Sequence, residues 1–403
     1  MPKATGMRKL PVSPVQELDP SQDPFGRESI ETLVARYGAP LFLIDAARVR
    51  AQYERLAAAL PGVELFYAIK CLPHASVVTT LRDAGASFDL ATSGEVELVR
   101  RLGVTPERCI HTHPIKRDSD IRTAASFGVR HFVVDNPDEL RKFAKFRNRT
   151  ALLIRVAFRS ADALCDLSRK FGCGPECVPE LLALAAELRI KVDGLSFHAG
   201  SQAAGPQMHV EAINVCREMM RGARDQGHEL SILDIGGGFP ADYLGESPID
   251  IEEFCAPIRR ALDSLEPKMR VIAEPGRFIA APSAIAISSV MGRAERDGRW
   301  WYYLDDGLYG SYSGQVFDRT QYPVEALGAS GPTFPSVLAG PTCDSIDVIR
   351  ENIALPKLKQ GDLVVGRVMG AYTWASATEF NFFPRTTVLA IDRGRLVREG
   401  EAR

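Results

Sequence analysis

Two features of this sequence place reactive groups at the ends of apolar, strand-like runs. Lys70 ends the run ELFYAIK, and a lysine beside a partly buried cavity can lose its proton and form a Schiff base with an aldehyde. Glycines 236–238 of LDIGGGFP follow another apolar run. Their backbone amides can surround a phosphate, because glycine permits close approach and unusual dihedral angles. A solvated strand end and a tight turn are the ordinary interpretations of these residues.

Two more residues extend the set. Glu274 in AEPGR offers a carboxylate able to pair with a pyridine nitrogen, and Arg277 follows three residues later; alone, the two could form a surface ion pair. His198 in SFHAGS ends an apolar run, where a buried structural histidine is the usual occupant. A Schiff-base lysine, a phosphate cradle and such a carboxylate together fit one cofactor, pyridoxal phosphate.

These residues fall in a regular alternation of short strand-like runs and longer helical stretches. Alternation predicts parallel strands, and eight of them predict an α/β fold with a closed (β/α)8, TIM-like barrel. The carboxyl ends of barrel strands form one rim, where Lys70, Asp89, Arg155, His198, the glycine run and Glu274 would gather. The predicted strands are Val63–Ile69, Ser87–Leu90, Cys109–Thr112, His131–Asp135, Leu152–Val156, Val192–His198, Ile232–Ile235 and Val271–Glu274. The predicted helices are Ser93–Leu102, Pro137–Arg147, Glu176–Leu188, Met208–Gln226 and Ile251–Leu265.

The alternation ends after Glu274. We therefore expect a barrel over residues 46–280 and a second, mostly β domain built from residues 29–45 and 281–403, behind a flexible leader of residues 1–28. The strands expected in the second domain are Leu41–Ile44, Trp300–Leu304, Asp362–Val368 and Thr386–Ile391.

The bulk composition excludes several classes of partner. The chain has 403 residues, 25% of them charged, and a formal net charge of −2, so we expect no nucleic acid and no anionic membrane as partner. The eight cysteines are scattered, and Cys173 and Cys177 have no second close pair, so we expect no metal site. The apolar stretch Phe278–Met291 is short and contains Pro282, so it should not span a bilayer. We expect a cytoplasmic protein, because the first residues hold no apolar signal-peptide core.

The chain resembles the fold-type III pyridoxal-phosphate decarboxylases, the group that holds ornithine, diaminopimelate and eukaryote-like lysine decarboxylases. The resemblance extends from about Leu41 to Phe383 and is carried by the blocks FYAIKC, FDLATSGEVELV, SFHAGS, LDIGGGFP, AEPGRF, DDGLYGSYSG, GPTCDSID and GAYTWASATEFN. It implies that Lys70 carries the cofactor as a Schiff base, His198 stacks on its ring and Glu274 pairs with the pyridine nitrogen. It places Asp89 and Arg155 near the ring edge. The phosphate contacts it implies are Gly237, Gly238, Arg277, Ser201 and Tyr372.

The resemblance also implies a homodimer that shares its active sites. Cys343 and Asp344 of GPTCDSID would then enter the partner's site, where the Cys343 thiol protonates the α-carbon after carbon dioxide leaves. In the ornithine branch, Asp344 and Asp318 would hold the distal ammonium of a small basic amino acid. The diaminopimelate branch typically carries CESGD at this cysteine, from which GPTCDSID differs. Ornithine, converted to putrescine, is therefore the expected substrate.

Several alternatives stay open at this point. Trp374, Glu379 and Arg319 differ from familiar ornithine enzymes, so lysine, or both diamino acids, could be the substrate. A diaminopimelate decarboxylase is a further alternative. A silent, antizyme-inhibitor-like protein should have lost catalytic residues, whereas Lys70 is present here. An alanine racemase-like enzyme should carry an arginine in the role of Glu274.

Overall fold

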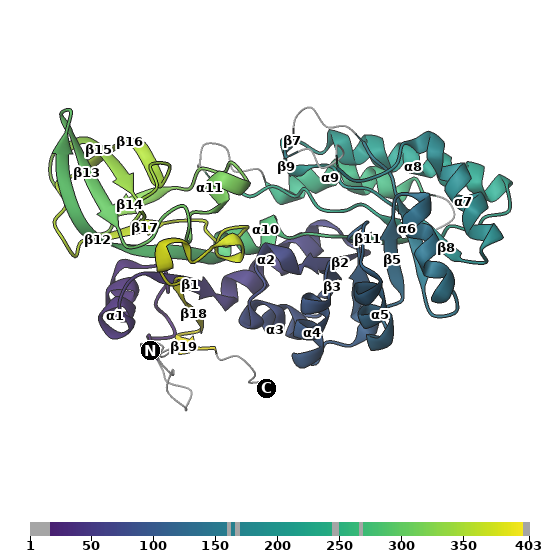
Figure 1. The fold of residues 1–403 in the computed structure, drawn as a ribbon, viewed down its shortest axis with the longest axis horizontal. Coiled ribbons are helices and arrows are strands. Elements are labelled where there is room, and N and C mark those ends of the chain that lie inside the picture. Colours follow the sequence, from purple (N-terminus) through teal and green to yellow (C-terminus); the bar gives the residue numbers. More distant parts are fainter. Residues whose placement is uncertain (1–16, 159–162, 166–169, 244–249, 266–268, 398–403) are drawn as a thin grey trace.

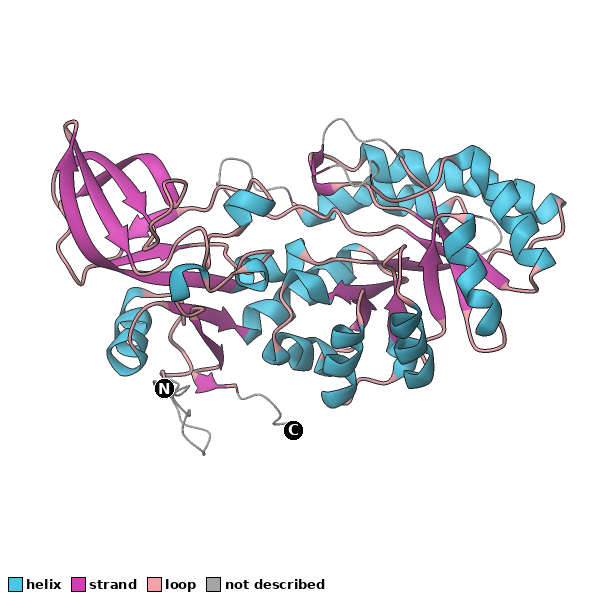
Figure 2. Ribbon diagram, viewed as in Figure 1, coloured by secondary structure: helices cyan, strands magenta, loops and turns pink. Residues whose placement is uncertain are grey.

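The computed structural model describes residues 17–158, 163–165, 170–243, 250–265 and 269–397. A closed barrel with surrounding helices and a large mixed β-sheet lie side by side (Figure 1). In Figure 2 the strands of the large sheet gather at one end of the molecule, and most of the helices surround the barrel.

The barrel contains the eight predicted strands, so that prediction is confirmed, with bounds shifted by at most two residues. Every neighbouring pair in it is parallel. Six apolar side chains from six different strands, such as Phe66 and Leu153, form one buried cluster, as only the interior of a closed barrel permits. The strands are β2 (Val63–Ala68), β3 (Ser87–Leu90), β4 (Cys109–His111), β5 (His131–Val134), β6 (Ala151–Arg155), β8 (Lys191–Ser196), β10 (Ile232–Asp234) and β11 (Arg270–Ala273).

Helices connect these strands and cover the barrel. Side chains of Asp45, Thr92, Asn136 and Asp250 accept hydrogen bonds from the first amides of four of them, which explains where those helices begin. The predicted helix over residues 137–147 ends earlier, at Lys142, and continues as a 3₁₀ turn. The helices are α2 (Ala46–Ala59), α3 (Ala75–Asp83), α4 (Ser93–Arg101), α5 (Asp118–Phe127), α6 (Pro137–Lys142), α7 (Val178–Glu187), α8 (Gln207–Asp225) and α9 (Ile251–Asp263).

The second sheet joins both ends of the chain. The N-terminal strand β1 (Leu41–Asp45) pairs antiparallel with β12 and parallel with β18, which confirms that it belongs to this sheet. The sheet order is β16-β15-β13-β12-β1-β18-β19, and β17 joins β12 to β14. Its other strands are β12 (Ala284–Arg296), β13 (Arg299–Leu304), β14 (Val324–Ala326), β15 (Thr333–Ala339), β16 (Val348–Pro356), β17 (Leu363–Gly366), β18 (Thr387–Asp392) and β19 (Arg395–Leu396).

Part of the predicted leader packs against this sheet. Residues 1–16 lie outside the described chain, but Leu18 and Phe25 are buried in a cluster with β1, β12 and β18 residues. Helix α1 (Arg27–Tyr37) follows directly. The prediction of a flexible leader up to residue 28 is therefore wrong for residues 17–28, because Leu18 and Phe25 pack into the hydrophobic core. The predicted boundary between the two domains stays a prediction.

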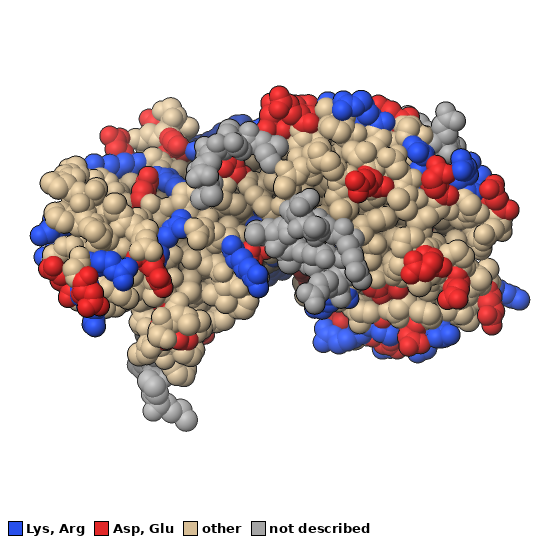
Figure 3. Space-filling view, turned by 90° about the horizontal axis from the view of Figure 1, so that it is seen from above, with Lys and Arg blue, Asp and Glu red and all other residues tan. Residues whose placement is uncertain are grey.

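The face of the molecule seen in Figure 3 shows no preference for one sign of charge. On the face seen in Figure 3, acidic and basic side chains are interspersed over both halves of the molecule. Within the described ranges, no helix combines the length and apolar character that crossing a bilayer requires.

Candidate active site

Lys70 lies directly after β2, in the 3₁₀ turn Ile69–Cys71. Its Nζ is 2.8 Å from a carboxylate oxygen of Asp89, at the end of β3, and Asp89 also accepts a hydrogen bond from Thr112. Burial alone would lower the pKa of Lys70, but the negative charge of Asp89, followed by Tyr372 and Glu274, raises it above its usual value. The side chain is still 45% exposed, so an aldehyde can reach it. Asp89 therefore holds the ammonium form of Lys70 in place, and this proton must be lost before Lys70 can act as a nucleophile.

The glycine run after β10 forms a cradle without side chains. A Cβ on Gly237 would lie 2.8 Å from the carbonyl oxygen of Glu274, and one on Gly238 would lie 2.6 Å from that of Gly200. Gly238 also has a φ of +104°, which favours glycine. The amides of Gly237 and Gly238 donate no hydrogen bond within the described part of the chain. Two free amides in a space that excludes side chains fit the phosphate of pyridoxal phosphate.

Arg277, at the start of the short helix α10 (Arg277–Ala280), supplies the positive charge of this cradle. Its two terminal nitrogens donate to the hydroxyls of Tyr243 and Ser201, each at 2.8 Å. A salt bridge of 2.5 Å joins it to Asp318, and its guanidinium lies 5.0 Å from the ring centre of Tyr372. The Nε of Arg277 is buried and has no acceptor among the described residues. A buried, unused donor beside two free amides fits a bound anion.

Glu274 follows β11 and is buried next to the glycine run, where its amide donates to the carbonyl of Gly236 at 2.7 Å. Burial, followed by the charges of Asp234 and Asp89, raises the pKa of Glu274 well above its ordinary value. A cation beside Glu274 would oppose this shift, because it would stabilise the carboxylate. The environment therefore suits a protonated pyridine nitrogen as the partner of Glu274.

His198 and Arg155 lie at the ends of neighbouring strands, β8 and β6. The Nδ1 of His198 accepts a hydrogen bond from the amide of Gly200 at 3.0 Å, so a neutral ring carries its proton on Nε2. Burial, followed by the positive charges of Arg155 and Lys70, keeps the pKa of His198 well below its usual value. A neutral, flat imidazole can stack on an aromatic ring without adding charge. Arg155 lies 5.7 Å from the ring centre of Phe171.

Cys343 and Asp344, the two site residues predicted in GPTCDSID, form no hydrogen bond with this cluster among the described residues. The hydroxyl of Tyr309 donates to Asp344, and the amide of Cys343 donates to the side chain of Asn381 at 3.0 Å. Both partners belong to the mostly β part of the chain, and the Cys343 thiol is exposed. Within one chain, the structure thus joins Asp318, but not Cys343 or Asp344, to the predicted cofactor contacts.

Sequence reasoning missed three side chains of this site. Thr112 is the last residue of the predicted strand Cys109–Thr112, Tyr243 follows the glycine run, and Asp234 lies within LDIGGGFP. Asp234 is buried, accepts from Ser196 at 3.1 Å and has its pKa raised by burial beside Glu274. The position of Asp234 just before the glycines and that of Thr112 at the carboxyl end of a predicted barrel strand were usable signals; Tyr243 gave none.

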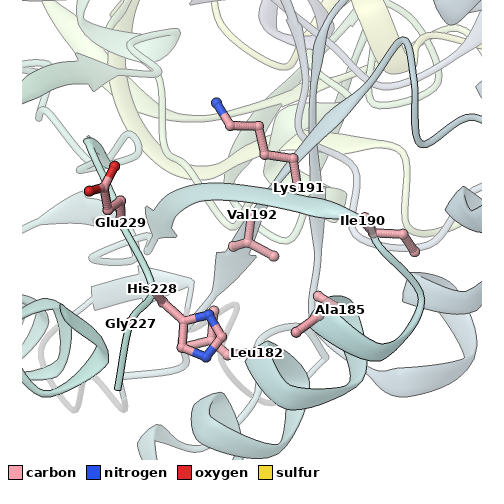
Figure 4. A pocket seen from close by; sticks show the side chains of 9 residues that line it. Leu182, Ala185, Ile190, Lys191, Val192, Gly227, His228 and Glu229 are labelled. Carbon is pink, nitrogen blue, oxygen red and sulfur yellow. The ribbon is translucent and has the colours of Figure 1, made fainter. Parts of the chain in front are cut away.

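A pocket of about 310 Å³ lies at the opposite end of the barrel (Figure 4). Lys191 and Val192 in its wall begin β8, whereas His198 follows the end of the same strand. Since every barrel strand runs in the same direction, this pocket is separate from the site described above.

Comparison with known proteins places the chain in a family. A model described as the pyridoxal-binding domain of pyridoxal-dependent decarboxylases matches residues 46–281. Lysine/ornithine decarboxylase from Selenomonas ruminantium is 35% identical over 367 residues, which cover 91% of this chain and 93% of that protein.

Two solved structures agree with this relationship. Lysine/ornithine decarboxylase from Vibrio vulnificus, complexed with putrescine, is 52% identical with a TM-score of 0.86, covering 91% of this chain and 98% of that one. The arginine decarboxylase of Paramecium bursaria Chlorella virus, bound to agmatine, is 31% identical with a TM-score of 0.86, covering 91% of this chain and 100% of that one. With the barrel, the glycine cradle and Lys70 in place, the chain belongs to the pyridoxal-dependent decarboxylases and uses pyridoxal phosphate as its cofactor.

Proposed function

We propose that this enzyme decarboxylates a basic amino acid with a distal ammonium group, with ornithine as the preferred substrate and putrescine as the product. The observation that carries this proposal is the position of Asp318, a carboxylate only 13% exposed, beside the predicted cofactor contact Arg277. One oxygen of Asp318 meets Arg277 and Thr320, and the other makes no hydrogen bond within the described chain. That second oxygen is available to a cationic substrate. The names of the relatives, which include ornithine, lysine and arginine decarboxylases, support a basic substrate.

The geometry of the barrel rim supports the following roles for the site residues. Bound pyridoxal phosphate supplies an electron sink for the electron pair left when carbon dioxide departs. Lys70 would hold the cofactor covalently, and Asp89, 2.8 Å from its amine, would orient that amine. The free amides of Gly237 and Gly238, with Arg277, Ser201 and Tyr372, bind the phosphate.

The remaining groups orient the cofactor and the substrate. Glu274 would keep a proton at the ring nitrogen, and His198 would pack its neutral ring against the cofactor. Arg155 and Asp89 would lie near the ring edge. The thiol of Cys343 delivers a proton to the α-carbon of the product.

An exposed apolar surface supports a homodimer with shared active sites. Phe382 is 98% exposed and Ile346 54%, and Phe380 and Phe383 are also partly exposed. Ile346 follows the Cys343–Asp344 segment closely in the chain, and Asn381, in the stretch Phe380–Phe383, bonds to the Cys343 amide. Such a concentration of exposed apolar side chains is typical of a protein interface. A second copy of the chain would cover it and receive Cys343 and Asp344 in its own site.

Lysine and arginine are the competing substrates. Lysine is longer than ornithine by one methylene, a difference worth only ~1–3 kcal/mol in most pockets. We therefore expect activity on both diamino acids. Arginine carries a wider, planar guanidinium that would need more space at Asp318.

The proposal is tested by supplying the purified enzyme with L-ornithine, L-lysine, L-arginine and meso-diaminopimelate, and the D forms of the first two, and by identifying the amine released. Putrescine formed from L-ornithine with the highest kcat/KM supports it. A clear preference for arginine or meso-diaminopimelate would contradict the diamine assignment but not the cofactor.

We also propose a cytoplasmic location. All seven cysteines whose side chains the structure describes are free thiols, as is usual in a reducing compartment. Fractionation of the native cells with an antibody to the enzyme tests this: the protein should be recovered in the cytosolic fraction.

A further inference from the structure

His209 is a buried histidine that none of the roles above uses. It lies in the first turn of α8, none of its surface is exposed, and its Nε2 is 3.0 Å from the carbonyl oxygen of Gly237. A carbonyl can only accept, so Nε2 carries the proton and donates it. The other ring nitrogen has no partner among the described residues.

The surroundings of His209 do not require a polar residue. Its ring packs among Phe197, Phe239 and Phe254, with centroid distances of 6.4, 5.4 and 5.9 Å. A phenylalanine would fill such a place without burying an unpaired nitrogen, which is unfavourable. Burial lowers the pKa of His209 to about 4, so the ring is neutral at physiological pH and contributes no charge. What the histidine adds over a phenylalanine is the hydrogen bond to Gly237.

That hydrogen bond holds one peptide of the glycine run. The carbonyl of Gly236 accepts from the amide of Glu274 at 2.7 Å, and the carbonyl of Gly238 accepts from the amide of Ala203 at 3.1 Å. Between them, the carbonyl of Gly237 is bonded by His209. The cradle excludes side chains at these positions, and glycine peptides are the most free to rotate. The middle peptide therefore depends on a side chain from α8 for its orientation.

The orientation of this peptide decides where an amide points. The only cis peptide bond among the described residues is Ala39–Pro40, so the bond between Gly237 and Gly238 is trans. In a planar trans peptide the carbonyl and the N–H point in opposite directions. With the Gly237 carbonyl held on His209, the amide of Gly238 points away from α8, and it donates to no other described residue.

We infer that His209 is a positioning residue for phosphate binding, since its hydrogen bond to the Gly237 carbonyl aims the Gly238 amide at the phosphate of pyridoxal phosphate. The inference rests on the assignment of the glycine run as the phosphate cradle in the proposed function. It assigns His209 an effect on the phosphate alone, and none on the reacting end of the cofactor.

The test compares two ligands that differ only in the phosphate. Apoenzyme is titrated with pyridoxal phosphate and, separately, with pyridoxal, and both are followed by the absorbance change on binding. His209→Phe and His209→Met lack the donor, whereas His209→Gln keeps an N–H at a similar reach. We expect the first two to raise the Kd for pyridoxal phosphate about five- to tenfold, the size of one lost neutral hydrogen bond. Their Kd for pyridoxal should stay within about twofold of the wild type, and His209→Gln should restore the affinity for pyridoxal phosphate.

Two controls separate positioning from packing. His111→Phe changes another fully buried histidine that forms no hydrogen bond among the described residues and should leave both Kd values unchanged. Phe254→Leu disturbs the aromatic surroundings of His209 without removing the donor, so any loss should be equal for both ligands. If His209→Phe does not fold, the pair His209→Met and His209→Gln decides, because these side chains are similar in size and differ in the donor.

The outcomes distinguish this inference from the proposed function. The role of His209 would be overturned if His209→Phe and His209→Met raised the Kd equally for both ligands, or left the Kd for pyridoxal phosphate unchanged. It would also be overturned if His209→Gln bound pyridoxal phosphate as weakly as His209→Met. A wild-type enzyme that binds no pyridoxal phosphate would instead overturn the assignment of the cradle itself.

Discussion

The carboxylate of Asp318 and the guanidinium of Arg277 form a nearly buried ion pair of 2.5 Å, with 13% and 4% of the two side chains exposed. Asp318, proposed to bind the substrate, is thus ion-paired with Arg277, proposed to bind the cofactor's phosphate. At this separation in a partly buried site, the negative charge of Asp318 offsets part of the attraction that Arg277 exerts on an anion. Substrate and cofactor contacts are therefore coupled through one pair of residues.

Asp318→Asn should separate these two functions. The substitution frees Arg277 from its counter-charge, so the Kd for pyridoxal phosphate should fall several-fold while kcat/KM for ornithine falls by a factor of ten or more. Titration of the apoenzyme and steady-state kinetics measure the two effects. Weaker cofactor binding would show instead that Asp318 mainly orients Arg277.

Lys70→Ala should abolish turnover and leave the fold intact. The exposed amine at the end of β2 is the group that can bind the cofactor covalently, and alanine offers no nucleophile. Assays of carbon dioxide release, absorbance spectra and circular dichroism measure turnover, covalent cofactor binding and the fold, respectively. Lys145→Ala, which removes a lysine with 74% of its side chain exposed, is the control and should retain full activity. Normal turnover by Lys70→Ala would end the assignment.

Mixing two inactive variants tests the shared site. If Cys343 acts in the partner's site, subunits carrying Lys70→Ala and subunits carrying Cys343→Ala should form hybrid dimers in which one of the two sites has both intact residues. About a quarter of the wild-type activity should return on random exchange, because half the dimers are hybrids and each has one complete site. Exchange proven by differently tagged subunits, without any return of activity, would contradict the shared-site arrangement.

Asp344→Ala should impair ornithine and lysine alike. The Tyr309 hydroxyl donates to Asp344 and keeps the pKa of this carboxyl below its ordinary value, so it is ionised at neutral pH. Loss of one carboxylate that faces a substrate ammonium should lower kcat/KM by roughly 30-fold or more. The Kd for pyridoxal phosphate should not change. Asp138→Ala, at a side chain that is 92% exposed, serves as the control. Unchanged ornithine turnover in Asp344→Ala would remove this residue from the substrate site.

Acid should destabilise the protein through its buried histidines. Burial lowers the pKa of His111 to about 3 and that of His209 to about 4, whereas an unfolded histidine titrates near ~6.5. The unfolded chain therefore binds more protons below this pH, and stability present above pH ~6.5 is lost as the pH falls. Each such histidine removes about 1.4 kcal/mol from the free energy of unfolding between pH 7.5 and 5.5.

The variant His111→Phe isolates one of these contributions. Its ring can stack on Phe132 as His111 does, at a centroid distance of 5.6 Å, without the two unpaired nitrogens. The free energy of unfolding, measured with urea at pH 7.5 and at pH 5.5, should fall between these two pH values in both proteins. The fall should be smaller in His111→Phe than in the wild type by about 1.4 kcal/mol. The same loss in both proteins would mean that His111 takes up its proton at the same pH in the folded and unfolded states, so burial does not shift its pKa.

Much of the fold and of the site's composition could be predicted from the sequence. Period and length identify elements of the barrel such as β3, and a closed parallel barrel places every strand's carboxyl end on one rim. Lys70, His198, the glycine run and Glu274 each follow a barrel strand, so their convergence required only the number and direction of the strands. The buried Phe25 and the long strand β12, by contrast, were not recognised. The start of β12 lies in the apolar stretch that follows Pro282, and its alternation is broken where the register shifts between Val290 and Gly292.

The contacts that set the chemistry were decided only by the tertiary structure. Asp318 contacts Arg277, and His209 contacts Gly237, which lies 28 residues later in the chain. A local hydrophobic period carries no information on contacts at such sequence separations. The pKa of Glu274 likewise depends on Asp234 and Asp89, which reach it from other strands. Periodicity reflects which face of an element is buried, and it therefore determines which strands and helices form. The partner of a buried polar side chain is set by packing between elements, and so it becomes visible only when the chain is folded.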